Sequence, residues 1–260
     1  MIKASDISKG NFAGRLKAAG IHLAISLTLA MLAAMLVFVV WYPYPYREIS
    51  GGRELFLIVV AVDVVMGPLM TLAVFNTAKP RKELRRDLGI IGLLQLAALA
   101  YGLWTVAVAR PVHLVFEIDR FRVVHAIDVS PELLRRAPAG MQQLPMTGPT
   151  LLSLRDFKDS KESFEATMAA LQGVALGARP DFWQPYLLAK TQVLARAKPL
   201  AELKARFPAN KKEIDSALQN AGRVPIDIGF IPMVGRQTFW TVLIDFKTAE
   251  VVAFVPIDSF

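Results

Sequence analysis

The chain has 260 residues, of which 54% are hydrophobic, and its formal net charge is +8 at pH 7. It contains no cysteine, which excludes a disulfide framework and thiolate chemistry. Residues 111–260 hold 18 Lys or Arg against 16 Asp or Glu, so most of the excess positive charge lies in the first 110 residues. A nucleic-acid-binding protein would carry a basic face on its folded domain, and we therefore expect no nucleic-acid partner.

Three apolar runs of transmembrane length dominate the first part of the chain. They lie at residues 20–42, 55–75 and 88–109. Each reaches the roughly 20 residues that cross a bilayer core, and none shows the polar face of a soluble amphipathic helix. The first run is longer than the apolar region of a signal peptide, about 7–15 residues, which favours an uncleaved anchor. The sequence predicts a short segment at 1–19 followed by a three-helix transmembrane region at 20–110.

Lys and Arg are unevenly distributed around these runs. Four precede the first run (Lys3, Lys9, Arg15 and Lys17), two lie between the first and second, and five lie between the second and third. The positive-inside rule then places the N-terminus and the second loop in the cytoplasm. We expect a bacterial inner-membrane protein whose C-terminal domain is periplasmic, with its basic loop at 79–86 against membrane lipids.

Residues 111–260 are predicted to form an α+β domain with a mainly antiparallel sheet. Strands are expected at 113–118, 121–127, 226–233, 237–246 and 251–256, and helices at 161–176, 185–197, 200–207 and 211–220. Because strands occur at both ends with helices between them, we expect the terminal strands to share one sheet. Both faces of the last two strands are apolar, so they are either buried under helices or form a partner-binding surface.

The sequence contains no recognisable catalytic, cofactor-binding or metal-binding motif. His113 and His125 lie on the first predicted hairpin, but spacing marks no further metal ligand, which favours structural histidines. Near the hairpin turn an acid pair could form from Glu117 and Asp119 or from Asp119 and Asp128, although carboxylates are common at such turns. We expect no catalytic residues, no cofactor and no metal.

Asp63 is the one ionisable side chain deep inside an apolar run. An intramembrane carboxylate tends to face protein or water, and here it is interpreted as a polar staple between helices rather than part of an ion path. At the same depth in the third run lies Tyr101, the expected hydrogen-bond partner. Gly67-Pro68 should kink the second helix, and Gln95 either packs among the helices of this chain or contacts a partner helix.

One stretch of the sequence is similar to a known family. It runs through GGRELFLIVVAVDVVMGPLMTLAVFN at 51–76, KPRKELRRDLGIIGLLQLAALAYGLWTV at 79–106 and RPVHLVFEIDRFRVV at 110–124. These segments resemble the type IV pilin accessory protein family (TfpX/TfpZ-like, FimB-like). At the matched positions, we expect the following residues to serve the fold or interactions: Gly51, Gly52, Asp63, Gly67, Pro68, Arg85 and Arg86.

The resemblance implies a non-enzymatic, chaperone-like inner-membrane factor that binds its cognate type IV major pilin and promotes pilus assembly or surface display. Two other classes remain open from the sequence. A membrane-anchored enzyme modifying pilin or envelope components would need convergent acids or histidines outside the membrane. A ligand-binding membrane sensor would need a cytoplasmic output module, for which the short cytoplasmic segments leave no room. A homodimer is compatible with the sequence.

Overall fold

The computed structural model describes residues 4–260, with side chains from Phe12 onward except that of Leu55. Lys3, counted above as a cytoplasmic charge, lies outside the described residues. The chain forms two compact units. One contains the residues up to Val39 and Gly52–Ala107, and the other contains Val40–Gly51 and Val108–Phe260.

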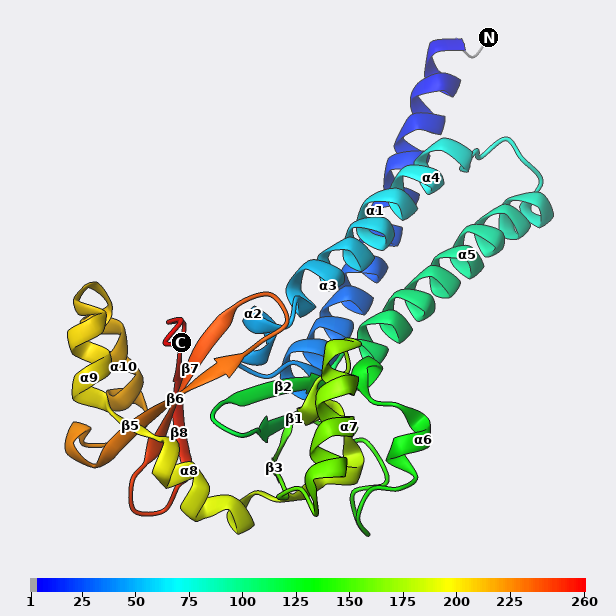
Figure 1. The fold of residues 1–260 in the computed structure, drawn as a ribbon. Helices are drawn as coiled ribbons and strands as arrows, with labels where there is room; N and C mark the ends of the chain where they lie inside the picture. Colours follow the sequence, from blue (N-terminus) through cyan, green and yellow to red (C-terminus); the bar gives the residue numbers. More distant parts are fainter. Residues whose placement is uncertain (1–3) are drawn as a thin grey trace. The chain divides into compact units, whose positions relative to one another are not determined.

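The first unit consists of apolar helices (Figure 1). In chain order they are α1 (Ala4–Met35), the π-helical η1 (Leu36–Trp41), α3 (Gly52–Ala61), the π-helical η2 (Val62–Met66), α4 (Gly67–Val74) and α5 (Arg81–Val108). Among the described residues, three continuous helical stretches are long and apolar enough to cross a membrane: Phe12–Trp41, Gly52–Val74 and Arg81–Val108. Each apolar run predicted from the sequence ends one residue beyond the corresponding stretch.

Residues 40–51 fold with the second unit, although the sequence analysis treated most of them as a loop between two membrane helices. Their short helix α2 (Tyr46–Ile49) buries Tyr46 and Ile49 in the core of the sheet domain. The amide of Gln237 donates a hydrogen bond to the carbonyl of Ile49 at 3.1 Å. The first loop and the C-terminal domain are therefore parts of one folded unit.

The second unit is built on one eight-stranded mixed sheet. Its strands are β1 (Pro111–Phe116), β2 (Phe121–His125), β3 (Thr150–Leu154), β4 (Trp183–Pro185), β5 (Lys198–Pro199), β6 (Ile228–Val234), β7 (Phe239–Asp245) and β8 (Val251–Val255). The order is β4-β3-β1-β2-β6-β7-β8, with β5 also paired to β6. Only the β1–β3 and β2–β6 pairings are parallel. This confirms a mainly antiparallel sheet shared by the strands at both ends of the domain.

Helices connect and cover the strands. They are α6 (Pro131–Leu134), α7 (Ser160–Leu171), α8 (Lys190–Arg196), α9 (Leu200–Arg206) and α10 (Lys211–Asn220), with 3-10 turns η3 (Ala126–Asp128), η4 (Leu176–Ala178), η5 (Pro180–Phe182), η6 (Tyr186–Ala189), η7 (Pro208–Asn210) and η8 (Pro225–Asp227). The helix expected at 161–176 ends earlier, at Leu171, and the one expected at 185–197 begins as η6. Strands β3, β4 and β5 were not predicted from the sequence.

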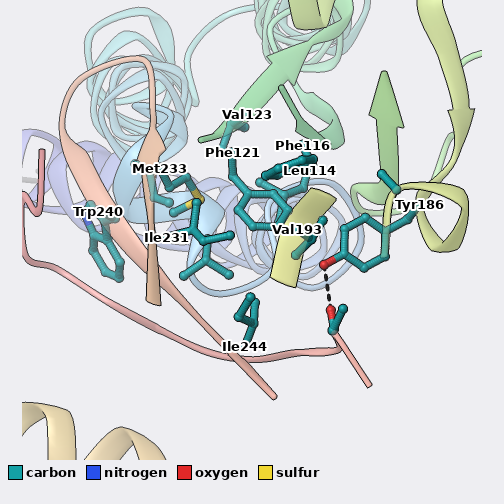
Figure 2. Close-up of a cluster of buried hydrophobic side chains, with 14 of the residues drawn as sticks. Leu114, Phe116, Phe121, Val123, Tyr186, Val193, Ile231, Met233, Trp240 and Ile244 are labelled. Atoms are coloured by element: carbon teal, nitrogen blue, oxygen red, sulfur yellow. Dashed lines mark hydrogen bonds between the residues drawn. The ribbon is translucent and has the colours of Figure 1, made fainter. Parts of the chain in front are cut away.

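Both faces of the central strands are buried because side chains alternate along each strand. In β6, Ile231 and Met233 point into one core with α2, η6 and α8, whereas Ile228 and Phe230 point into the opposite core with α9 and α10. Figure 2 shows the first of these cores, in which the Tyr186 hydroxyl donates to the carbonyl of Ala249 at 2.6 Å.

Strand β7 is buried beyond its first residue, which fits the reading of its apolar faces as core. Trp240 is only 7% exposed, and its ring meets that of Tyr44 edge-on at 6.3 Å. Tyr44 belongs to the segment that folds with the sheet domain. The side chain of Trp240 is thus packed against this chain rather than presented to a partner.

Candidate functional site

Five polar side chains within the apolar helices line one groove. They are His22 and Ser26 on α1, Asp63 on η2, Thr71 on α4 and Gln95 on α5. The groove has a volume of about 620 Å³, and its remaining lining residues are apolar side chains and one glycine. Of these five residues, only Asp63 and Gln95 were predicted from the sequence as interaction residues. The four-residue spacing of His22 and Ser26, which places both on one helix face, was the available signal.

The walls of this groove are single faces of α1 and α5. On α1 they comprise Ala18, Ile21, His22, Ile25, Ser26 and Leu29, and on α5 Leu88, Gly92, Gln95, Leu96 and Leu99. Residues spaced three and four apart share a helix face, and each wall runs for about 16 Å at a rise of 1.5 Å per residue. Asp63 and Thr71 line it from the second helical stretch, and Phe75 lines it from the residue directly after that stretch.

Two hydrogen bonds tie these helices together. His22 Nδ1 bonds to Thr71 Oγ1, which links α1 to α4. Gln95 Nε2 donates to the main-chain carbonyl of Asp63 at 3.2 Å, which links α5 to η2. Two buried oxygens are left without a hydrogen-bond partner, Asp63 Oδ1 and Gln95 Oε1. The site therefore has spare acceptors.

The π turn explains why the carbonyl of Asp63 takes a side-chain donor. A π turn pairs a carbonyl with the N–H five residues later, which for Asp63 is residue 68. That residue is Pro68, and proline has no N–H. Gly67 permits the substitute contact, because a Cβ built there would lie 1.8 Å from Gln95 Nε2. Pro68 therefore leaves the Asp63 carbonyl free to accept a hydrogen bond, and Gly67 leaves the space that the Gln95 amide occupies.

Tyr101 does not form the contact with Asp63 that was expected. Its side chain is 69% exposed and lies 5.8 Å from the ring of Trp104, and it lines a separate hollow with residues of α3 and η2. The expectation rested on depth alone. Tyr101 lies six residues beyond Gln95, which rotates it by about 120° to another face of α5. Gln95 fills the linking role instead, through the backbone rather than the carboxylate of Asp63.

The histidines of the sheet domain are buried and locally bonded. His113 Nδ1 lies 2.7 Å from Thr150 Oγ1, and its ring meets Trp183 edge-on. Burial lowers the pKa of His113 from 6.5 to about 4, so the imidazole is neutral at physiological pH. His125 Nδ1 lies 3.2 Å from Asp128 Oδ2. Among the described residues, no group of three metal-ligating side chains gathers around either ring.

The carboxylates beside the β1–β2 turn are engaged in ion pairs. Glu117 Oε1 accepts from Arg122 Nε and from the amide of Gly177, both at 2.7 Å. Asp119 Oδ1 accepts from Arg120 Nε at 2.7 Å. Each acid thus has a cationic partner of its own, which differs from two carboxylates sharing one reaction centre.

Comparison with known proteins shows to which family the chain belongs. A family model described as fimbrial assembly protein FimB matches residues 10–51. A fimbrial assembly protein of serogroup I from Dichelobacter nodosus is 36% identical over 256 residues, covering 98% of this chain and 99% of that protein. A serogroup E1 protein from the same organism is 34% identical with the same coverage. The chain belongs to the family of fimbrial assembly proteins. No solved structure matches it.

In this fimbrial assembly protein, the segment that matches the family model crosses from one compact unit to the other. It contains the α1 wall of the groove, with His22 and Ser26, and then the residues that fold with the sheet domain, with Tyr46 and Ile49. The segments that carried the resemblance in the sequence begin where this match ends. The full-length relatives cover both.

The other residues singled out from the sequence do not line the groove. Gly51 adopts a φ of +71°, and a Cβ built there would lie 2.7 Å from Gln237 Nε2. Gly52 begins α3. Arg85 and Arg86 are exposed on the first turns of α5. Gly51 and Gly52 thus lie where the chain enters α3, and Arg85 and Arg86 are exposed charged residues. The structure does not bring these four residues together with Asp63 in one site.

Proposed function

We propose that this protein is a non-enzymatic, membrane-anchored accessory factor of type IV pilus biogenesis, which binds its pilin and promotes pilin assembly or surface display. The observation that carries the proposal is similarity to fimbrial assembly proteins over nearly the whole chain. Both the helical unit and the sheet domain are included in that similarity. The function is therefore assigned to the whole protein rather than to one module.

The division into units supports the proposed orientation. Residues 40–51 belong to the sheet domain, which supports a topology with the first loop and the C-terminal part of the chain on the same side of the membrane. The distribution of Lys and Arg among the loops supports a periplasmic location for that side. Arg85 and Arg86, at the start of α5, then lie on the cytoplasmic side next to anionic lipid headgroups.

A partner with a membrane-embedded helix and a head outside could be held at both places. The groove offers apolar walls and unpaired acceptors inside the membrane region. Outside it, Phe164, Met168 and Leu171 lie at helical spacing on α7 and are exposed, Leu171 to 77%. Exposed apolar side chains on one helix face are typical of protein-contact surfaces.

The proposal is tested by deleting the gene and restoring it on a plasmid. We expect deletion to reduce the amount of surface pili recovered by shearing, while the total pilin in cells is still detectable by immunoblot. Unchanged surface pili would contradict the accessory role.

A photo-crosslinker tests the outer contact. In place of Leu171, p-benzoylphenylalanine should capture pilin in living cells. In place of the exposed Lys212 on α10, it should not. Equal capture at the two positions would argue against a specific contact through α7.

A further inference from the structure

The groove between α1 and α5 has the shape of a helix-binding site. Its two walls, from Ala18 to Leu29 and from Leu88 to Leu99, are continuous helix faces about 16 Å long. A side chain at Gly92 would meet nothing within 4 Å, so the α5 wall faces open space there. Small residues on such walls, such as Ala18 and Gly92, allow a further helix to approach closely.

The polar groups of the groove require a donor. Asp63 and Gln95 are 8% and 9% exposed, and each keeps one buried oxygen without a partner. Away from water, an unpaired acceptor has a large desolvation penalty, which a hydrogen-bond donor would remove. The Gln95 amide donates to the main-chain carbonyl of Asp63, and Asp63 Oδ1 accepts no hydrogen bond from it. No side chain among the described residues donates to either oxygen, and a donor supplied by a partner would satisfy them.

We propose that this groove receives an apolar, membrane-embedded helix of a partner protein, and that the helix presents a hydrogen-bond donor to Asp63 Oδ1 and Gln95 Oε1. The inference rests on the proposed function for the identity of that partner, the pilin. A lipid acyl chain would also fit the apolar walls, but it carries no donor and would leave both oxygens unpaired. The two walls have equal lengths of about 16 Å, and two buried acceptors lack a partner. Together these features favour a helix that carries a hydrogen-bond donor over a lipid chain.

The groove contact is tested at a matched pair of leucines on α5. Leu96 lines the groove and is 56% exposed, whereas Leu94 is 60% exposed and does not line it. With p-benzoylphenylalanine in the full-length protein in living cells, the Leu96 position should capture pilin and the Leu94 position should not. Equal capture at both positions, or capture at Leu96 of only lipid or a second copy of this chain, would overturn the proposal.

The donor is tested with Asp63 variants in the Leu96 crosslinking background. Asp63→Leu should lower pilin capture about tenfold, because the acceptor of the proposed hydrogen bond is removed. Asp63→Asn keeps an acceptor oxygen and should retain most of the capture. Asp63 Oδ1 accepts no hydrogen bond from the described residues, so the Leu variant should accumulate at the level of the unmodified protein. Undiminished capture by Asp63→Leu would overturn the role of the acceptor.

Failure of this inference is distinguishable from failure of the proposed function. If deletion of the gene removes surface pili but Leu96 captures no pilin, the groove inference is wrong and the accessory function stands. If deletion leaves surface pili unchanged while Leu96 still captures pilin in an Asp63-dependent way, the groove inference stands and the accessory function is wrong.

Discussion

Gln95 and Gly67 fit together so closely that a Cβ at residue 67 would lie 1.8 Å from the Gln95 amide nitrogen. That nitrogen donates to the carbonyl of Asp63, which the proline at position 68 leaves without its own π-turn donor. The close approach of α5 to the second helix therefore depends on glycine at one position. The bond from Gln95 Nε2 to the Asp63 carbonyl also fixes the position of the Gln95 side chain, which lines the groove.

Gly67→Ala should destabilise the helical unit. The added methyl group displaces the Gln95 side chain and breaks its bond to Asp63, and overpacking of this kind costs about 1–3 kcal/mol. Thermal unfolding of the purified protein in detergent measures the effect. Gly89→Ala on α5 is the control, since a Cβ there meets nothing within 4 Å. Equal melting temperatures for the two variants would contradict the close contact.

Orientation is tested with alkaline phosphatase fusions, because the enzyme is active only outside the cytoplasm. Fusions after Gly51 and after Phe260 should both be active, since these residues belong to one folded unit. A fusion near Arg81 should be inactive. The reverse pattern would overturn both the topology and the periplasmic assignment of the sheet domain.

The long apolar helices and most strands could be predicted because each is encoded in a local pattern. Long apolar runs indicate the helices, and α10 (Lys211–Asn220) has the predicted bounds. The short strands β4 and β5 have only three and two residues, too few to show alternation. β3 pairs in parallel with β1, a contact that depends on tertiary structure rather than on a turn.

The groove illustrates a different limit of sequence reasoning. Depth along the helices identified Asp63 and Gln95 as polar residues in apolar runs, but the partner chosen for Asp63 was Tyr101. Which face of α5 turns inward depends on the π turn at residues 62–66 and on the close approach at Gly67. Neither is visible in hydropathy. The placement of residues 40–51 in the sheet domain was likewise hidden, because it depends on contacts with strands far along the chain.

Tyr186→Phe should destabilise the sheet domain. The Tyr186 hydroxyl is buried and donates to the carbonyl of Ala249, and its removal leaves a buried acceptor unpaired, at a cost of about 1–3 kcal/mol. The midpoint of urea unfolding, followed by near-UV circular dichroism, reports the change. Tyr44→Phe is the matched control, because the Tyr44 side chain is exposed. If the urea midpoint shifted equally in both variants, the Tyr186 hydrogen bond would not explain the loss of stability.

His113 should make the sheet domain less stable in mild acid. Burial lowers its pKa in the folded state to about 4, whereas the unfolded side chain has its ordinary pKa of 6.5. Between these values the unfolded state binds a proton that the folded state does not, so stability falls as pH decreases from 6.5 towards 4. From pH 7 to pH 5 the contribution of this group is about 2 kcal/mol.

The measurement compares urea unfolding of the unmodified protein and of His113→Gln at both pH values. Other groups titrate over the same range, so the informative quantity is the difference between the two proteins. His113→Gln should be less stable at pH 7, because the glutamine loses the ring packing against Trp183, and should lose less stability on acidification. If both proteins lose the same stability between pH 7 and pH 5, protonation of His113 is not coupled to unfolding.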